Sequence, residues 1–194
     1  MKNSLMWFRY DLRIKDNDAL FEALINQLCL PVFIFDKGYS KLETTSNFHL
    51  KFLNDSLIDL NKNLKFFFDT KLNFYNGNTV EILNFLIDKY KINTVYSNKI
   101  FKGKYFIKLD NKVSSLMTEK GICWFESNQF GIQLDKRKRG KWSADWHKFM
   151  HNPLRPKIEA KGFLEGDSGL VNLNFDQINC QKGGESKALS CLKT

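Results

Sequence analysis

Residues 7–20 read WFRYDLRIKDNDAL, and residues 31–36 read PVFIFD. The first stretch continues an apolar run at 4–8 into a charged turn and then into an amphipathic segment. The second stretch is another apolar run, and it ends at Asp36. Short, continuous apolar runs are typical of strands buried on both faces. The order strand, helix, strand therefore predicts two parallel strands connected by a helix.

The same alternation continues to about residue 130, and it predicts a Rossmann-like α/β fold. We expect a doubly wound, five-stranded parallel sheet with helices on both faces, since parallel strands need helical crossovers. The predicted strands lie at 4–8, 30–35, 72–75, 94–96 and 122–125, and the predicted helices at 19–28, 46–64, 80–90 and 108–120.

Beyond residue 130 the sequence changes character, so we predict two regions, 1–130 and 131–194. The second region begins with a basic run at 136–141 and then has a short amphipathic segment at 142–150. Three glycines between residues 160 and 170 predict an irregular, loosely attached tail, and a further helix is expected to begin near 183.

The composition predicts a folded protein with a basic surface. The chain has 194 residues, 43% of them hydrophobic, and a formal net charge of +9. A basic protein can bind phosphate groups, and Trp142 and Trp146 beside the basic run could add base stacking. The alternative that we favour is a solvated linker whose tryptophans pack on another domain.

The cysteines and the hydropathy predict a cytoplasmic protein. The four cysteines show no CxxC spacing and are typical of reduced thiols. No window approaches the ~18 apolar residues that a membrane span requires, so we expect no membrane contact.

Ligands of doubly wound sheets bind beyond the carboxyl ends of the strands. Glycine-rich phosphate loops are absent from the sequence, so a ligand there would be held by side chains. Asp36 could accept a hydrogen bond from such a ligand, or it could cap a helix. The alternating charges from Arg9 to Asp16 predict ion pairs that make this loop rigid and tie it to a neighbour.

The sequence predicts neither a metal site nor a hydrolytic site. His147 and His151 are four residues apart on one expected helix, but a third ligand is not evident. We therefore expect no metal, and we assign no catalytic residue.

The segments 7–20, 52–64 (FLNDSLIDLNKNL), 95–98 (VYSN) and 121–126 (GICWFE) resemble, in order and spacing, the α/β domain of the DNA photolyase/cryptochrome family. Residues 183–192 (GGESKALSCL) are similar to the start of that family's helical FAD-binding domain. The resemblance implies that the α/β domain can hold an antenna chromophore, which is a folate, a deazaflavin or a flavin. FAD, the electron-transfer tryptophans and the pocket for a flipped pyrimidine dimer belong to the helical domain.

On this resemblance the candidate cofactor-binding residues are those at the strand ends: Phe8, Arg9, Phe35, Asp36 and Asn98. Many relatives carry an acidic residue and arginines after the fourth strand, whereas residues 98–110 of this chain read NKIFKGKYFIKLD, and we expect those roles to be unfilled. This departure speaks against a folate in particular.

The resemblance implies a protein related to deoxyribodipyrimidine photolyases or blue-light receptors. Because the FAD-binding domain has no positions in these 194 residues, we expect the chain to be inactive alone and to contact DNA weakly or through that domain. The alternative is a stand-alone nucleotide- or chromophore-binding module, or a docking module that pairs with a separately encoded helical subunit. Its docking face would be formed by Trp142, Trp146, Phe149 and Met150.

Overall fold

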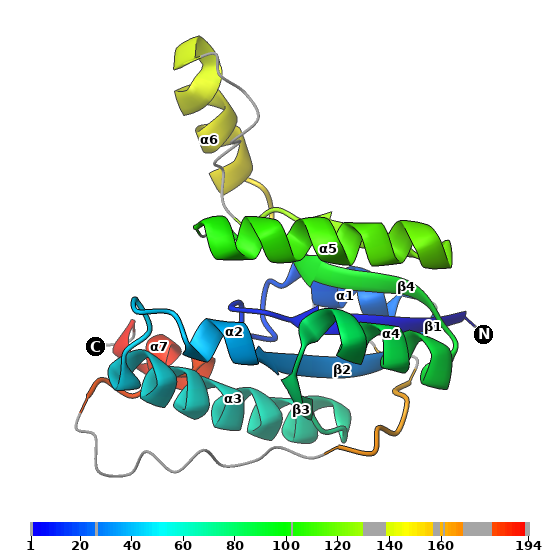
Figure 1. Cartoon of the computed structure of the whole chain (residues 1–194). Helices are drawn as coiled ribbons and strands as arrows, with labels where there is room; N and C mark the ends of the chain where they lie inside the picture. Colours follow the sequence, from blue (N-terminus) through cyan, green and yellow to red (C-terminus); the bar gives the residue numbers. More distant parts are fainter. Residues whose placement is uncertain are drawn as a thin grey trace.

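The structure is a computed structural model that describes residues 2–25, 27–101, 103–129, 139–156, 160, 162–168 and 180–192. Its centre is a five-stranded sheet in the order β3-β2-β1-β4-β5, in which every neighbouring pair is parallel (Figure 1). The strands are β1 (Lys2–Phe8), β2 (Gln27–Asp36), β3 (Asn73–Gly77), β4 (Ile92–Asn98) and β5 (Cys123–Ser127).

Helices cover both faces of the sheet, and each face has its own hydrophobic core. Because side chains alternate along a strand, Met6 and Phe8 point to one face, and Leu5 and Trp7 to the other. The first core includes residues of α1 (Asp18–Leu24) and α3 (Asn47–Phe68). The second includes residues of α4 (Thr79–Tyr90) and α5 (Lys104–Lys120). The predicted doubly wound α/β fold is confirmed.

The predicted helix at 19–28 is too long. α1 ends at Leu24, and β2 already begins at Gln27, which pairs with Lys2 at the start of β1. Seven consecutive residue pairs join β1 to β2. This strand pairing places Leu28 in β2, although Leu28 continues the helical spacing of apolar residues. A short helix, α2 (Lys37–Ser40), was also not predicted.

Side-chain caps set the starts of α1, α3 and α4 close to the predicted positions, whereas α5 begins at Lys104, before the predicted residue 108, and has no side-chain cap. The Asn17 Oδ1 atom accepts a hydrogen bond from the Leu20 amide at 3.1 Å at the start of α1. Ser46 caps α3, and Asn78 caps α4. In the sequence, these polar residues directly before apolar stripes indicated where the helices begin.

Part of the tail is bound firmly to the α/β unit, contrary to the expectation of loose attachment. The Cys29 amide donates to the Gly162 carbonyl at 3.2 Å, and the Leu164 amide donates to the Cys29 carbonyl at 2.9 Å. Asp167 accepts hydrogen bonds from the hydroxyls of Tyr75 at 2.8 Å and Tyr90 at 2.9 Å.

The tail also contains two α-helices among its described residues. The predicted helix at 142–150 is α6 (Trp142–Met150), which buries no residue and stands away from the sheet (Figure 1). α7 (Glu185–Cys191) lies against α3. The first half of the basic run, residues 136–138, falls outside the described residues.

Neither a membrane span nor a metal cluster is found in the described part of the chain. None of its helices is long and apolar enough to cross a membrane. It also contains no group of three or more His, Cys, Asp or Glu residues able to hold a metal ion.

Candidate functional site

The chain reverses its direction across the sheet between β1 and β4, which are neighbours although two other strands separate them in sequence. Ligands of doubly wound sheets bind near this point, beyond the carboxyl ends of the strands. The residues after β1, after β2 and at the end of β4 therefore form the candidate site. They fall into three groups.

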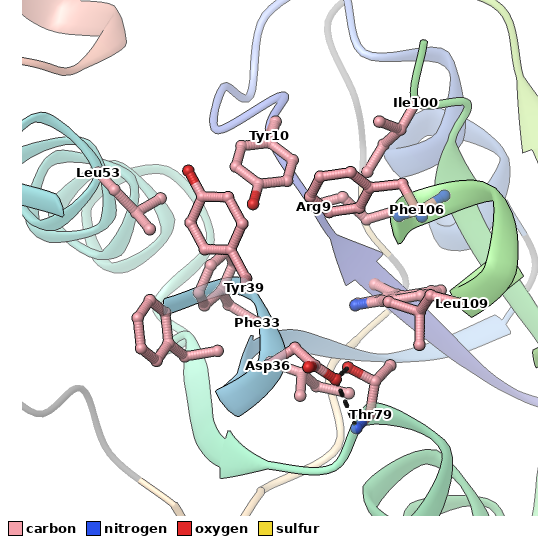
Figure 2. A pocket seen from close by; sticks show the side chains of 13 residues that line it. Arg9, Tyr10, Phe33, Asp36, Tyr39, Leu53, Thr79, Ile100, Phe106 and Leu109 are labelled. Carbon is pink, nitrogen blue, oxygen red and sulfur yellow. Dashed lines mark hydrogen bonds between the residues drawn. The ribbon is translucent and has the colours of Figure 1, made fainter. Parts of the chain in front are cut away.

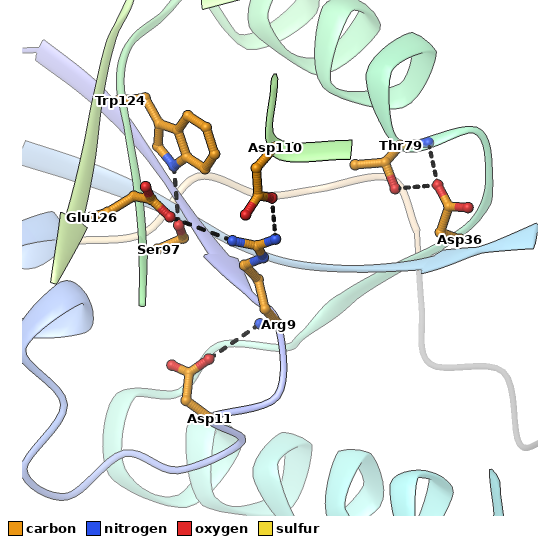
Figure 3. A network of polar contacts seen from close by, with 8 residues as sticks. All are labelled: Arg9, Asp11, Asp36, Thr79, Ser97, Asp110, Trp124 and Glu126. Atoms are coloured by element: carbon orange, nitrogen blue, oxygen red, sulfur yellow. Dashed lines mark hydrogen bonds and ion pairs between the residues drawn. The ribbon is translucent and has the colours of Figure 1, made fainter. Parts of the chain in front are cut away.

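The first group is centred on Arg9, whose side chain is only 2% exposed. Its guanidinium forms ion pairs with Asp110 of α5 and, at 3.4 Å, with Glu126 of β5 (Figure 3). It also lies 4.5 Å above the Trp7 ring. Arg9 thus ties the charged loop to neighbouring elements through ion pairs with distant segments, whereas the contacts of Asp11 and Arg13 described below are hydrogen bonds.

The pKa values of both carboxyl partners are shifted. Burial raises the pKa of Asp110 and of Glu126, and the nearby Arg9 guanidinium opposes this rise. Sequence reasoning missed these two residues because it looked for an acidic residue directly after β4. The sequence signal that could have identified them is one carboxylate on the side of α5 that faces the sheet and another carboxylate within β5.

The second group closes the loop after β1. Asn98, at the end of β4, donates from Nδ2 to Asn17 Oδ1 at 2.9 Å and to the buried carboxylate of Asp11. Asp11 also accepts from the Arg9 amide at 3.3 Å (Figure 3). Burial raises the pKa of Asp11, against the lowering effect of the bond from Asn98. Asn98 thus holds the loop in place.

The third group is centred on Asp36, which caps α2. Its carboxylate accepts from the Gly38 amide at 2.8 Å, from the Thr79 amide at 3.0 Å and from the Thr79 hydroxyl at 2.6 Å. The Tyr105 hydroxyl is a further donor. Burial alone would raise the pKa of Asp36, but the bonds from Thr79, Tyr105 and Gly38 lower it below its ordinary value. Of the two roles predicted for Asp36, the structure shows the helix cap.

A small cavity lies between these groups, with a volume of about 30 Å³. Arg9 and Asp36 line it, together with the rings of Tyr10, Tyr39 and Phe106 (Figure 2). Phe35 lines it as well. The other two candidates do not line it. Phe8 is fully buried in the core beside α1 and α3, and Asn98 makes the loop contacts described above.

The sequence matches the family model described as DNA photolyase over residues 4–129. The chain belongs to the DNA photolyase family. It is similar to the deoxyribodipyrimidine photo-lyase of Buchnera aphidicola, with 30% identity over 219 aligned positions that cover all of this chain and 44% of the relative. It is also similar to cryptochrome-1 of Aedes aegypti, with 33% identity over 97 positions, or 46% of this chain and 18% of the relative.

Solved photolyases share the fold of this photolyase-family chain. The class III photolyase of Agrobacterium tumefaciens superimposes with a TM-score of 0.80 at 18% identity, covering 100% of this chain and 44% of that protein. The photolyase of Sulfolobus tokodaii superimposes with a TM-score of 0.76 at 24% identity, covering 99% of this chain and 46% of that protein. Its structure is described with two FAD molecules and as implying a novel light-harvesting cofactor. The chain thus spans less than half the length of these photolyases.

The cavity between these three groups is too small for an antenna chromophore, although two larger hollows lie nearby, one of about 710 Å³ beside Asp36 and one of about 500 Å³ beside Asn98. Ligand pockets usually enclose about 300–1,000 Å³, whereas this cavity has room for a water molecule or two. The carboxylate of Asp36 and the guanidinium of Arg9 are already engaged within the protein. Neither is left to bind a chromophore.

Proposed function

We propose that these 194 residues form the α/β half of a photolyase/cryptochrome-type flavoprotein and act in it as a non-catalytic scaffold. In this proposal a helical domain holds FAD and carries out the chemistry, either light-driven repair of pyrimidine dimers or blue-light sensing. The main support is that Arg9, Asp11 and Asp36 are all engaged in structural contacts. None of them is left to bind a substrate or to transfer a proton.

We propose further that α6 is the docking face for the helical domain. Trp142 is 53% exposed and Met150 is 55% exposed, although both are large and apolar. Exposed apolar side chains gathered on one element mark surfaces that a partner covers. On this proposal residues 131–194 are the linker and the first part of the helical domain. The division at residue 130 and the cytoplasmic location stay predictions.

The first experiment tests catalysis by the chain alone. The purified 194-residue chain is illuminated with blue light in the presence of an oligonucleotide that carries a pyrimidine dimer. We expect no repair and weak binding of the oligonucleotide, since flavin chemistry and the pocket for a flipped base belong to the helical part. Light-dependent repair by this chain would contradict the proposal.

The second experiment tests docking. The part of the Buchnera photo-lyase that follows its matched α/β region is co-expressed with this chain, and copurification is measured. We expect a complex that the double substitution Trp142→Ala, Met150→Ala weakens. Phe85→Ala serves as the control, because Phe85 is 49% exposed but lies on α4. Equal copurification of the double variant and the control would exclude α6 as the docking face.

A stand-alone chromophore-binding module is the other candidate function. An absorbance spectrum of the purified protein distinguishes the two. A bound folate, deazaflavin or flavin would absorb in the near ultraviolet or the blue, whereas the scaffold alone is colourless. The small cavity favours the colourless result.

A further inference from the structure

Three aromatic rings meet at the carboxyl ends of β1 and β2, where this fold would bind a ligand. Tyr10 follows β1, Tyr39 lies in α2, and Phe106 lies in the first turn of α5. We refer to these three side chains as the ring cluster. They come from three separate elements and converge on one point (Figure 2).

The rings of the cluster pack directly on one another. The Tyr10 centroid lies 5.5 Å from that of Tyr39 and 5.5 Å from that of Phe106, and both contacts are edge-to-face. Tyr39 and Phe106 are 5.8 Å apart. These are the spacings of favourable aromatic pairs, so each ring supports the position of the other two.

The polar groups around the cluster are also engaged. Burial, together with the neighbouring Tyr39 hydroxyl, raises the pKa of Tyr10, so its hydroxyl stays neutral. In the described part of the chain, three buried side-chain polar atoms lack a hydrogen-bond partner: Asp55 Oδ2, Asn73 Oδ1 and Ser127 Oγ. None of these three residues lines the cavity. No buried polar atom is thus left unpaired to await a ligand there.

We propose that the ring cluster fills the space beyond the carboxyl ends of β1 and β2, so that no planar antenna ligand binds there between Arg9 and Asp36. The cavity of about 30 Å³ is what remains beside the rings. Removal of two of the rings opens a site for a planar heteroaromatic molecule such as a flavin. The inference rests on the proposed function in one respect: both assign a structural role to the residues at the strand ends.

The test is a titration of the purified chain with riboflavin and with FMN, followed by quenching of flavin fluorescence. We expect no saturable binding by the wild-type chain. The double variant Tyr10→Ala, Tyr39→Ala binds saturably, with a Kd at least about tenfold below the highest concentration at which the wild type shows no saturation, which corresponds to about 1.4 kcal/mol. Phe66→Ala, which removes an aromatic ring that is 81% exposed at the end of α3, behaves as the wild type does.

Circular dichroism first establishes that each variant is folded. Tyr39→Ala alone is the second variant, and it decides the question if the double variant does not fold, because Tyr39 is only partly buried in a short helix. Saturable binding of either flavin by the wild-type chain overturns the inference. So does a folded variant that binds no more tightly than the wild type, because the rings would then not be what excludes the ligand. Neither result bears on repair by the chain alone, which the illumination experiment tests separately.

Discussion

Replacing Arg9 by methionine should destabilise the fold strongly and in a pH-dependent way. Methionine keeps most of the apolar length that packs near Trp7, but it leaves the carboxylates of Asp110 and Glu126 without their cation. Removing one partner of a buried ion pair costs about 3–5 kcal/mol. The two carboxylate side chains are 23% and 27% exposed. Water therefore recovers part of the loss, and we expect about 2–3 kcal/mol.

The pH dependence follows from the carboxyl groups. The pKa values of Asp110 and Glu126 are already raised in the folded protein, and loss of Arg9 raises them further. A carboxyl group whose pKa is higher in the folded than in the unfolded state destabilises the fold once the pH rises above its ordinary pKa. The difference between the Arg9→Met variant and the wild type should therefore be larger at roughly pH 8 than at roughly pH 5.

Urea unfolding followed by circular dichroism measures both effects. In thermal unfolding the expected loss is a decrease in Tm of about 4–12 °C for a chain of this size. Arg13→Met is the matched control, because within the described residues Arg13 donates to the Lys15 and Asp16 carbonyls and to Gln129 and has no ion pair, and it should lose about 1 kcal/mol or less. Equal losses for the two variants, or a loss for Arg9→Met that does not change with pH, would refute the reasoning.

Three further predictions follow from the contacts described above and from one in the tail. Tyr105→Phe removes a donor to Asp36, so the pKa of Asp36 should rise toward its ordinary value in an NMR titration, with a loss of about 1 kcal/mol of stability. Glu185→Ala removes the carboxylate that accepts from two amides of the loop after β1 at 2.9 and 3.0 Å, so hydrogen exchange of those amides should quicken about tenfold; unchanged exchange would show that the contact does not hold the loop. Leu57→Ala, which truncates a buried side chain of α3, should lower the free energy of unfolding by about 2–5 kcal/mol in urea, and Phe66→Ala by less than about 0.5 kcal/mol.

Local sequence patterns were sufficient to predict the fold. Continuous apolar runs such as 4–8 and 30–35 indicated buried strands, and capping residues such as Asn17 and Ser46 indicated the helix starts. The end of α1 was wrong because strand pairing with β1 is not a local property of residues 25–28.

The candidate site could be located from the sequence, but its contacts could not. The rule for doubly wound sheets placed Arg9 and Asp36 at the right edge. The partners of Arg9 lie 101 and 117 positions away, so only the packing of α5 and β5 brings them together. Tyr10 and Tyr39 had no pattern that marked them, because each is an isolated tyrosine in a polar segment.

The contact between Glu185 and the loop after β1 has a consequence for how the protein is made. Residues 14 and 185 are separated by 171 positions, so the loop after the first strand cannot form these hydrogen bonds until residue 185 has been synthesised. Contacts between residues this far apart form late and slow folding. On the ribosome the strands and helices can assemble in the order of synthesis. The loop after the first strand therefore reaches its final structure only after all five strands of the sheet have been synthesised.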